Sequence, residues 1–288
     1  MNIKKNILVI GANGQLGLEF RTIEKKFPAY HFLFASREEL SIEDQDSVNN
    51  FFSYQSIHYC INCAAYTAVD KAETEKEKAI AINATAVGNL AAVCKKQQAV
   101  FFHFSTDYVF NGEATVPYKE TDATDPVNFY GQTKLQGEQA AFKNNEESIV
   151  IRTSWVYSSY GKNFVKTMLR LMKEKESIGV VADQYGCPTY ASDLAEAVMQ
   201  MIDANSFVEG VYHYCNQGVI SWHQFATAIK ELSSSNCVVN AIETSAYPTP
   251  AARPHYSALD TQKIQQQYHL SLKGWKESLA ICLHEMEK

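Results

Sequence analysis

Short apolar runs alternate with longer helical patterns through the first half of the chain, and this alternation constrains the fold more than any other feature. The runs are rich in β-branched and aromatic residues and are largely apolar throughout. They are NILVI (6–10), YHFLFA (30–35), HYCINC (58–63), AVFFHFS (99–105) and SIVIRTS (148–154). Apolar strands separated by helices are typical of a parallel sheet covered on both faces. We therefore predict an α/β fold with a Rossmann-type, doubly wound parallel sheet.

The order of elements loosens after Trp155, which predicts a second, smaller unit. The expected helices are near 16–26, 44–55, 79–96 and 128–138 in the first half, and near 161–175, 191–203, 221–233 and 274–287 beyond it. Short strands are expected at 177–181, 210–215 and 237–242. Residues 244–257 carry three prolines and no periodicity, which predicts a loop over a surface or a ligand. We expect a dinucleotide-binding domain at 1–154. Residues 155–288 would form mainly a mixed α/β C-terminal lobe for substrate, with some segments returning to the first domain.

Charge, apolar runs and cysteine usage exclude several classes of function. Lys and Arg number 26 against 32 Asp and Glu, and they are scattered, which argues against a nucleic-acid surface. No apolar run approaches the roughly 20 residues of a membrane helix, and no secretory signal is recognisable. The seven cysteines and eight histidines are dispersed, so we expect reduced core thiols and no catalytic metal. The chain is therefore expected to be cytoplasmic, with neither nucleic acid nor membrane as a partner.

The sequence GANGQLG at 11–17 follows directly on the first predicted strand and opens the first helix. Gly11 would allow a tight turn, Gly14 the approach of a pyrophosphate, and Gly17 close packing of the helix. The helix N-terminus would supply free N–H groups for phosphate. The spacing is GxxGxxG rather than GxGxxG, and a purely structural turn is the alternative. Its place between strand and helix favours dinucleotide binding.

The end of the second strand bears on the choice of cofactor. An NAD-binding protein would carry an acid there for the ribose 2′-hydroxyl. This chain instead reads FASREE, with Ser36 and Arg37 at that place. Arg37 suits a 2′-phosphate and favours NADPH, whereas the alternative is a solvated surface arginine.

The stretch NFYGQTKLQGE at 128–138 places Tyr130 four residues before Lys134 among good helix formers, so both are expected on one helical face. A nearby ammonium is expected to lower the tyrosine pKa, which would make Tyr130 a proton donor. Ser105 and Thr106 end the fourth strand, where open α/β sheets bind ligands, and Thr106 would orient a reacting carbonyl oxygen. YxxxK alone occurs by chance in many helices. The glycine loop, the strand-end hydroxyl and YxxxK in this order together predict carbonyl reduction.

With these motifs the chain resembles the dTDP-4-dehydrorhamnose reductase family of the extended short-chain dehydrogenase/reductases. The resemblance covers nearly the whole chain through GANGQLG, NCAAYTAVDKAE (62–73), STDYVFNG (105–112), YGQTKLQGE (130–138), RTSWVY (152–157), DQYGCPTYASDLA (183–195) and ARPHYSALD (252–260). STDYVF, AAYTAVDKAE and QYGCPTY are specific to this group. The resemblance implies an oxidoreductase of dTDP-rhamnose biosynthesis. NADPH, or alternatively NADH, would deliver hydride to C4 of dTDP-4-dehydro-L-rhamnose.

The resemblance also implies roles for individual residues. Tyr130 would be the proton donor, Lys134 would hold the nicotinamide ribose and depress the tyrosine pKa, and Thr106 would bond the substrate oxygen. Substrate contacts are expected at Thr106, Asp107 and Trp155, although the Trp155 indole is alternatively plain core. Cofactor contacts are expected at Gly11, Gly14, Gln15, Leu16, Gly17, Arg37, Ile42, Ala64, Ala65, Tyr66, Thr67, Tyr130 and Lys134.

Three departures from the family pattern leave alternatives open. LSIED replaces the usual LDITD, so Ser41 stands for an Asp near the adenine and only Ile42 keeps the pattern. RPHYS replaces RPxNS and puts Tyr256 in place of Asn, which keeps a 4-ketoreductase for another nucleotide deoxysugar in play. Glu19 matches one ligand of a magnesium found at some dimer interfaces, but the other ligands are not evident, so we predict no metal and a monomer or homodimer. A non-catalytic regulatory subunit of the methionine adenosyltransferase beta type is the alternative outside enzymes.

Overall fold

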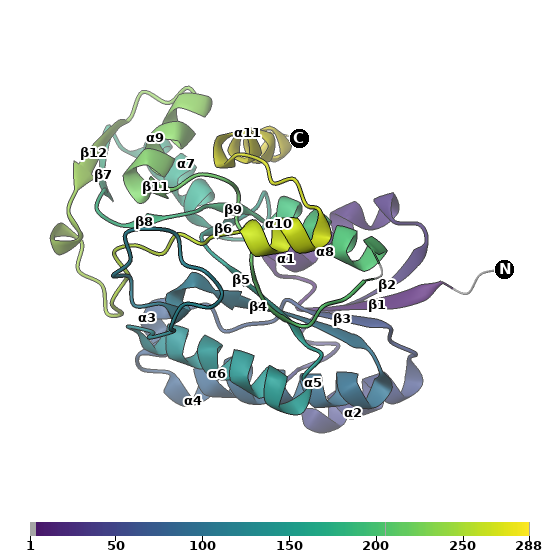
Figure 1. Ribbon diagram of the computed structural model, residues 1–288. Coiled ribbons are helices and arrows are strands. Elements are labelled where there is room, and N and C mark those ends of the chain that lie inside the picture. The colour runs from purple at the N-terminus through teal and green to yellow at the C-terminus, as the bar shows by residue number, and fades with distance from the viewer. Residues whose placement is uncertain (1–3, 205, 288) are drawn as a thin grey trace.

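A six-stranded parallel sheet forms the centre of the computed structural model, which describes residues 4–204 and 206–287 (Figure 1). The strand order is β10-β5-β4-β3-β1-β2, and every pairing is parallel. The strands are β1 (Lys5–Ile10), β2 (Tyr30–Ala35), β3 (Tyr59–Asn62), β4 (Val100–Thr106), β5 (Ile149–Thr153) and β10 (Gly210–His213). The predicted Rossmann-type fold is confirmed. The chain reverses its direction across the sheet between β1 and β3, and ligands of such sheets bind at the carboxyl ends of strands beside this point.

Helices cover both faces of the sheet, because side chains alternate between faces along each strand. Ile7 and Val9 point to the face covered by α1 (Gln15–Ile23), α8 (Ala191–Ala204) and α10 (Gln262–Tyr268). Leu8 and Ile10 point to the other face, which packs against α2 (Gln45–Tyr54), α4 (Lys76–Ile80), α5 (Ala86–Gln97) and α6 (Phe129–Asn144). Figure 1 shows the two layers above and below the sheet. Because β10, α8 and α10 lie beyond residue 154, segments of the second half do join the central sheet and its layers.

A separate apolar cluster lies at the carboxyl end of the sheet, at the upper left of Figure 1. It is built from α7 (Phe164–Glu174), α9 (Trp222–Leu232), α11 (Trp275–Met286) and the parallel pair β7 (Ser177–Val181) and β12 (Val238–Ile242). Two short ladders connect it to the sheet: β6 (Val156–Tyr157) with β9 (Thr189–Tyr190), and β8 (Tyr185–Gly186) with β11 (Ile220–Ser221). These elements agree with the expected C-terminal helices and strands to within a few residues.

One expected helix is interrupted. Residues 79–96 were predicted as one continuous helix, but a π-helical turn at Ala81–Thr85 separates α4 from α5. The turn carries Asn83, whose Oδ1 accepts from the Tyr66 amide at 2.8 Å and whose Nδ2 donates to the Tyr66 carbonyl at 3.0 Å. Nδ2 also donates to Thr133 Oγ1 in α6 at 3.0 Å. A π turn inserts one extra residue, and here it directs Asn83 to hold the segment after β3.

Smaller differences concern element ends and short helices. Helix α1 ends at Ile23 and continues as a 3-10 turn at Glu24–Lys26. The short helix α3 (Val69–Ala72) and helix α10 had no counterpart among the expected elements. The expected loop at 244–257 is irregular apart from a 3-10 turn at Thr244–Ala246. Within residues 4–204 and 206–287, no helix has both the length and the apolar character needed to span a bilayer.

Candidate active site

The glycine loop joins β1 to α1 at the carboxyl edge of the sheet, and its shape requires glycine. Gly11 has φ +76°, and a Cβ there would lie 2.7 Å from the Ala64 amide nitrogen. A Cβ on Gly17 would lie 2.5 Å from the Gly11 carbonyl oxygen. The tight turn and the close helix packing expected of these two glycines are therefore present. Gly14 lines the cavity beside the loop and caps α1 without any side-chain hydrogen bond, which leaves this helix N-terminus available to a phosphate.

A cavity of about 270 Å³ lies beside this loop. It is lined by the carboxyl ends of β1, β2 and β3 and brings together the predicted residues Gly11, Gly14, Arg37, Ile42, Ala64 and Ala65. Its wall also includes residues that the sequence analysis did not select: Asn13, Glu38, Leu40, Ser41, Glu43, Cys63 and Ile82. Most of these residues are next to selected positions in the sequence, and this proximity is the feature that could have predicted them. Ile82 comes from the π turn, which no local pattern indicated.

The other predicted cofactor residues lie outside the cavity wall: Gln15, Leu16, Gly17, Tyr66, Thr67, Tyr130 and Lys134. The Gln15 side chain accepts a hydrogen bond from Asn163 Nδ2 at 2.9 Å, and Leu16 packs against the core under α1. Tyr66 is buried in the core on the α5 side, whereas Thr67 is exposed. Their contact with a cofactor stays a prediction.

Arg37 stands at the mouth of the cavity and pairs with Glu43. Its Nη2 lies 2.7 Å from Glu43 Oε2, and the two side chains are 66% and 30% exposed. An exposed pair of this kind holds little free energy, so a ligand anion can displace the carboxylate. The cavity thus offers glycine backbone, helix amides and a displaceable arginine, which together fit the phosphates of a dinucleotide.

Thr106 and Tyr130 meet at the carboxyl end of β4. Thr106 Oγ1 donates to Asp107 Oδ1 at 3.0 Å and accepts from the Tyr108 amide at 3.2 Å. Tyr130 lies in the first turn of α6, whose N-cap Asn128 accepts from the Gly131 amide at 2.8 Å, and its hydroxyl bonds the Thr106 side chain. The helix approaches this closely because residue 131 is glycine: a Cβ there would lie 2.1 Å from the Tyr108 carbonyl oxygen.

The expected lowering of the Tyr130 pKa is wrong in this structure. Burial raises the pKa of Tyr130 to about 12, the Thr106 hydrogen bond lowers it in part, and the Asp107 charge raises it further. Lys134 does lie one turn further along α6, as predicted, but its ammonium points elsewhere. Lys134 Nζ donates to the Phe104 carbonyl at 2.6 Å and lies 3.3 Å from His103 Nε2. Burial lowers the pKa of Lys134 to about 8, and Glu138 opposes that effect.

A buried ion pair beneath Lys134 was missed by the sequence analysis. Arg152 Nε and Nη2 donate to Glu138 Oε1 and Oε2 at 2.9 and 2.7 Å, and Ser105 Oγ donates to Oε1 at 2.5 Å. Ser105 therefore points away from Thr106, because adjacent residues of a strand face opposite sides. The four-residue spacing of Tyr130, Lys134 and Glu138 was the signal that places all three on one face of α6.

Asp107 and Trp155, the other expected substrate contacts, both have unusual surroundings. Asp107 is 2% exposed, its Oδ2 has no hydrogen-bond partner of good geometry, and burial raises its pKa to about 7. Trp155 is half-buried with φ +48° and stacks on Trp222 with ring centroids 3.5 Å apart. A bulky residue rarely adopts positive φ, and such conformations gather at functional sites. The Trp155 indole is thus packed on Trp222 and in part exposed to solvent.

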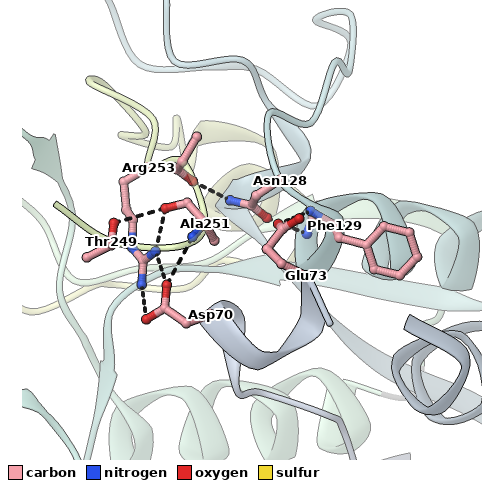
Figure 2. A network of polar contacts seen from close by, with 9 residues as sticks. Asp70, Glu73, Asn128, Phe129, Thr249, Ala251 and Arg253 are labelled. Atoms are coloured by element: carbon pink, nitrogen blue, oxygen red, sulfur yellow. Dashed lines mark hydrogen bonds and ion pairs between the residues drawn. The ribbon is translucent and has the colours of Figure 1, made fainter. Parts of the chain in front are cut away.

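Residues 247–256 form a segment that we call the strap, and Figure 2 shows Thr249, Ala251 and Arg253 of this segment beside Asp70. Asn128 Nδ2 donates to the Ala252 carbonyl at 2.8 Å, and the Tyr256 amide donates to the Gly112 carbonyl at 3.2 Å. Tyr256 itself is half-buried against the cluster that contains Val109 and Phe110. The strap therefore lies against the segment that follows Thr106 and against the start of α6. The expected loop over a surface or a ligand is thus present, and its contact with a ligand stays a prediction.

Glu19 occupies an enclosed position. It is 2% exposed, accepts from Ser158 Oγ at 2.6 Å, and burial raises its pKa. In the part of the chain that the structure describes, no group of three or more His, Cys, Asp or Glu side chains is placed to hold a metal ion.

Comparison with known proteins agrees with this geometry. The family model of the RmlD substrate binding domain matches residues 5–288. The spore coat polysaccharide biosynthesis protein SpsK of Bacillus subtilis is 40% identical over 279 residues, covering 97% of both chains. The dTDP-4-dehydrorhamnose reductase of Burkholderia thailandensis is 38% identical over 301 residues, covering 97% of this chain and 98% of that protein.

A solved structure of the dTDP-4-dehydrorhamnose reductase of Bacillus anthracis, in complex with NADP, is 36% identical. It superimposes with a TM-score of 0.94 and covers 98% of this chain and 100% of that one. The family model and these full-length relatives agree. The chain belongs to the RmlD substrate binding domain family, the family of the dTDP-4-dehydrorhamnose reductases.

Proposed function

We propose that this protein reduces the C4 keto group of dTDP-4-dehydro-L-rhamnose to give dTDP-L-rhamnose, with NADPH as the preferred cofactor and NADH as a second one. The observation that carries the proposal is that Tyr130 and Thr106 meet at the carboxyl end of β4, the neighbour of β3, whose end lines the cavity beside the glycine loop. The full-length relatives named for this reaction, one of them bound to NADP, give independent support.

The glycine loop, the α1 N-terminus and Arg37 are the groups that would hold the cofactor phosphates. Ala64 and Ala65 line the cavity from β3, while Gln15, Leu16, Tyr66 and Thr67 border it in sequence. When bound, the nicotinamide supplies the hydride. Lys134 is the cation nearest in sequence to Tyr130, and we assign to it the nicotinamide ribose.

Tyr130 would give its proton to the sugar oxygen at C4, with Thr106 bonding the same oxygen. A phenol with a pKa of about 12 is fully protonated at neutral pH, so it is ready to donate. Hydride would form the new C–H bond at C4 while the electron pair of the C=O π bond moves to the oxygen, which becomes an alkoxide, a much stronger base than a phenolate. The transfer is therefore favourable even with the pKa of Tyr130 raised.

Asp107 and Trp155 are the side chains we assign to the sugar. The unpartnered Oδ2 of buried Asp107 requires a donor, which a sugar hydroxyl supplies. We assign residues 1–154 to the cofactor and residues 155–288 mainly to the sugar nucleotide. All seven cysteines are free thiols, which favours a reducing compartment, and we place the reaction in the cytoplasm.

Tyr130→Phe tests the proposal directly. The variant should lose at least about 100-fold in kcat for NADPH oxidation with the dTDP-keto sugar, because general acid catalysis contributes that much or more. Its Kd for NADPH should be unchanged. Tyr54→Phe is the matched control, since Tyr54 is 85% exposed at the end of α2. Wild-type rates in Tyr130→Phe would refute the assignment.

A panel of nucleotide keto sugars separates the alternatives. Faster reduction of another deoxysugar would assign the protein to a different 4-ketoreductase, and Tyr256 would then be the first residue to exchange. If wild-type protein oxidised NADPH with none of these sugars, the proposed reductase activity would be refuted. The protein would then be assigned to the alternative, a non-catalytic regulatory subunit.

A further inference from the structure

The substrate end and the cofactor end of the site are tied together by one carboxylate, Asp70. It follows the segment after β3 and begins the single turn of α3. Arg253, in the strap, reaches it from 183 residues away in the sequence. Figure 2 shows the two side chains facing each other between the α3 segment and the strap.

Asp70 forms three interactions with the strap. Arg253 Nη1 donates to Asp70 Oδ1 at 2.5 Å, Nη2 donates to Oδ2 at 3.0 Å, and the Ala251 amide donates to Oδ1 at 3.2 Å. The Arg253 side chain is 18% exposed, so this bidentate pair is better shielded than an ordinary surface pair. The Arg253 hydrogen bond holds the pKa of Asp70 below its usual value, which burial opposes.

The strap is arranged internally around the same guanidinium. Arg253 Nη1 also donates to the Ala251 carbonyl at 2.6 Å, and Thr249 Oγ1 donates to that carbonyl at 3.0 Å. Asp70 is therefore the acceptor that joins an otherwise self-bonded turn to a different part of the protein. Loss of the carboxylate would leave the turn formed but detached from the α3 segment.

The α3 segment begins at the cofactor cavity. Ala64 and Ala65 line the cavity, and Asn83 holds Tyr66 through both its backbone amide and its carbonyl. Asp70 comes only four positions after Tyr66. A ligand that fixes the backbone at 64–66 therefore restricts the position of the Asp70 carboxylate.

The same segment reaches the helix that carries Tyr130. Glu73, three residues after Asp70, accepts from the Phe129 amide at 2.8 Å at the start of α6 (Figure 2). The positive charge of Arg253 acts to lower the pKa of Tyr108. The Tyr108 and Tyr130 rings lie edge to face, with their centroids 6.1 Å apart. The strap held by Asp70 also bonds Asn128, the N-cap of α6, two residues before the reacting tyrosine.

We propose that Asp70 is a positioning residue that couples binding of the nucleotide sugar to binding of the nicotinamide cofactor, by latching the strap to the cofactor-side segment. The identity of both ligands rests on the proposed function. Asp70 already bonds Arg253 in this structure, and cofactor at the cavity would hold residues 64–66 and with them the α3 turn, which would keep the latched strap in place at the sugar end. Coupling of this kind is reciprocal, so each ligand should tighten the other by the same factor.

The test is a binding experiment in which no turnover occurs. Because dTDP-L-rhamnose and NADPH are both in the reduced state, they form a dead-end complex. The Kd of dTDP-L-rhamnose is measured by titration calorimetry without and with saturating NADPH. In wild-type protein NADPH should tighten it at least about fivefold. In Asp70→Asn, whose amide nitrogen would face the Arg253 donors, the tightening should fall below about twofold while the Kd of NADPH alone is unchanged.

Two further variants separate a latch from general loosening. Arg253→Gln should lose the coupling to the same extent, and Asp70→Asn combined with Arg253→Gln should lose no more than either alone. Asp183→Asn is the matched control: Asp183 accepts from the Thr244 amide at 2.9 Å and the Thr244 hydroxyl at 2.8 Å, just before the strap, without touching the α3 segment. It should keep the coupling factor even where the affinity itself changes.

Turnover of the dTDP-keto sugar by wild-type protein is measured in parallel. If the enzyme is active but the coupling factor is the same in Asp70→Asn as in wild type, the latch is overturned and the proposed function stands. A coupling factor of one in active wild-type protein also overturns the latch. An inactive wild type whose coupling still requires Asp70 supports the latch and overturns the proposed reaction.

Discussion

Glu138→Gln should destabilise the fold strongly, because it leaves a buried guanidinium without its counter-charge. The side chains of Arg152 and Glu138 are 5% and 4% exposed, and Arg152 Nη1 has no hydrogen-bond partner even in the wild type. Removing one member of a buried pair costs about 3–5 kcal/mol, out of a total stability of about 5–15 kcal/mol. At about 2–4 °C per kcal/mol for a chain of this size, Tm should fall by on the order of 10 °C.

The same change should alter the pH dependence of catalysis. Burial already lowers the pKa of Lys134 to about 8, and Glu138 is the charge that opposes this. Without that charge the pKa of Lys134 falls further, so the lysine loses its proton closer to neutral pH. The rate of NADPH oxidation should then decline at a lower pH than in the wild type.

Urea unfolding followed by circular dichroism at one fixed pH measures the loss of stability. Glu138→Gln combined with Arg152→Met removes both charges and should recover most of the lost free energy. Glu146→Gln breaks the exposed pair with Lys95 and should leave the midpoint unchanged. A loss below about 1 kcal/mol in Glu138→Gln would show that the carboxylate is not what compensates Arg152.

Two further changes test the charges at each end of the site. Burial raises the pKa of Asp107 from its ordinary 3.8 to about 7, so its contribution to stability is full below about pH 4 and is lost as the pH rises through 7. Between pH 4 and 8 the free energy of unfolding, measured with urea, should therefore fall less in Asp107→Asn than in wild-type protein, by up to about 4 kcal/mol. Equal dependence on pH in the two proteins would contradict this expectation. Arg37→Ala should raise KM for NADPH by about tenfold or more and leave KM for NADH nearly constant, because a charge-assisted contact to the 2′-phosphate is lost. Steady-state kinetics with both cofactors measure this, and unchanged discrimination would return Arg37 to the role of a surface residue paired with Glu43.

Local patterns were sufficient for five of the six strands of the central sheet, for the glycine loop and for the helix that carries Tyr130 and Lys134. Each of the five predicted apolar runs overlaps a strand of the central sheet, and the glycine loop lies between β1 and α1 as expected. Strand and helix periodicity depend on neighbouring residues, and the requirement for glycine at Gly11 depends on one backbone angle. The helical spacing of Tyr130 and Lys134 is local in the same sense.

Contacts between distant segments decided the rest. The direction of the Lys134 ammonium depends on the Phe104 carbonyl and His103, which β4 brings beneath α6. The raised pKa of Tyr130 reflects burial, which no spacing of residues reveals. The π turn at Asn83 arises from its bonds to Tyr66 and to Thr133, far along the chain.

The amino-acid sequence by itself determined the fold class, the strand-end site and the family to which the chain belongs, because these depend on periodicity and on short motifs. Only the tertiary structure decided which charges meet. Asp70 and Arg253 stand 183 residues apart, and Glu138 finds Arg152 on a neighbouring strand. Pairings of this kind are set by how β-strands and helices pack, and their strength depends on burial, so both appear only when the chain is folded.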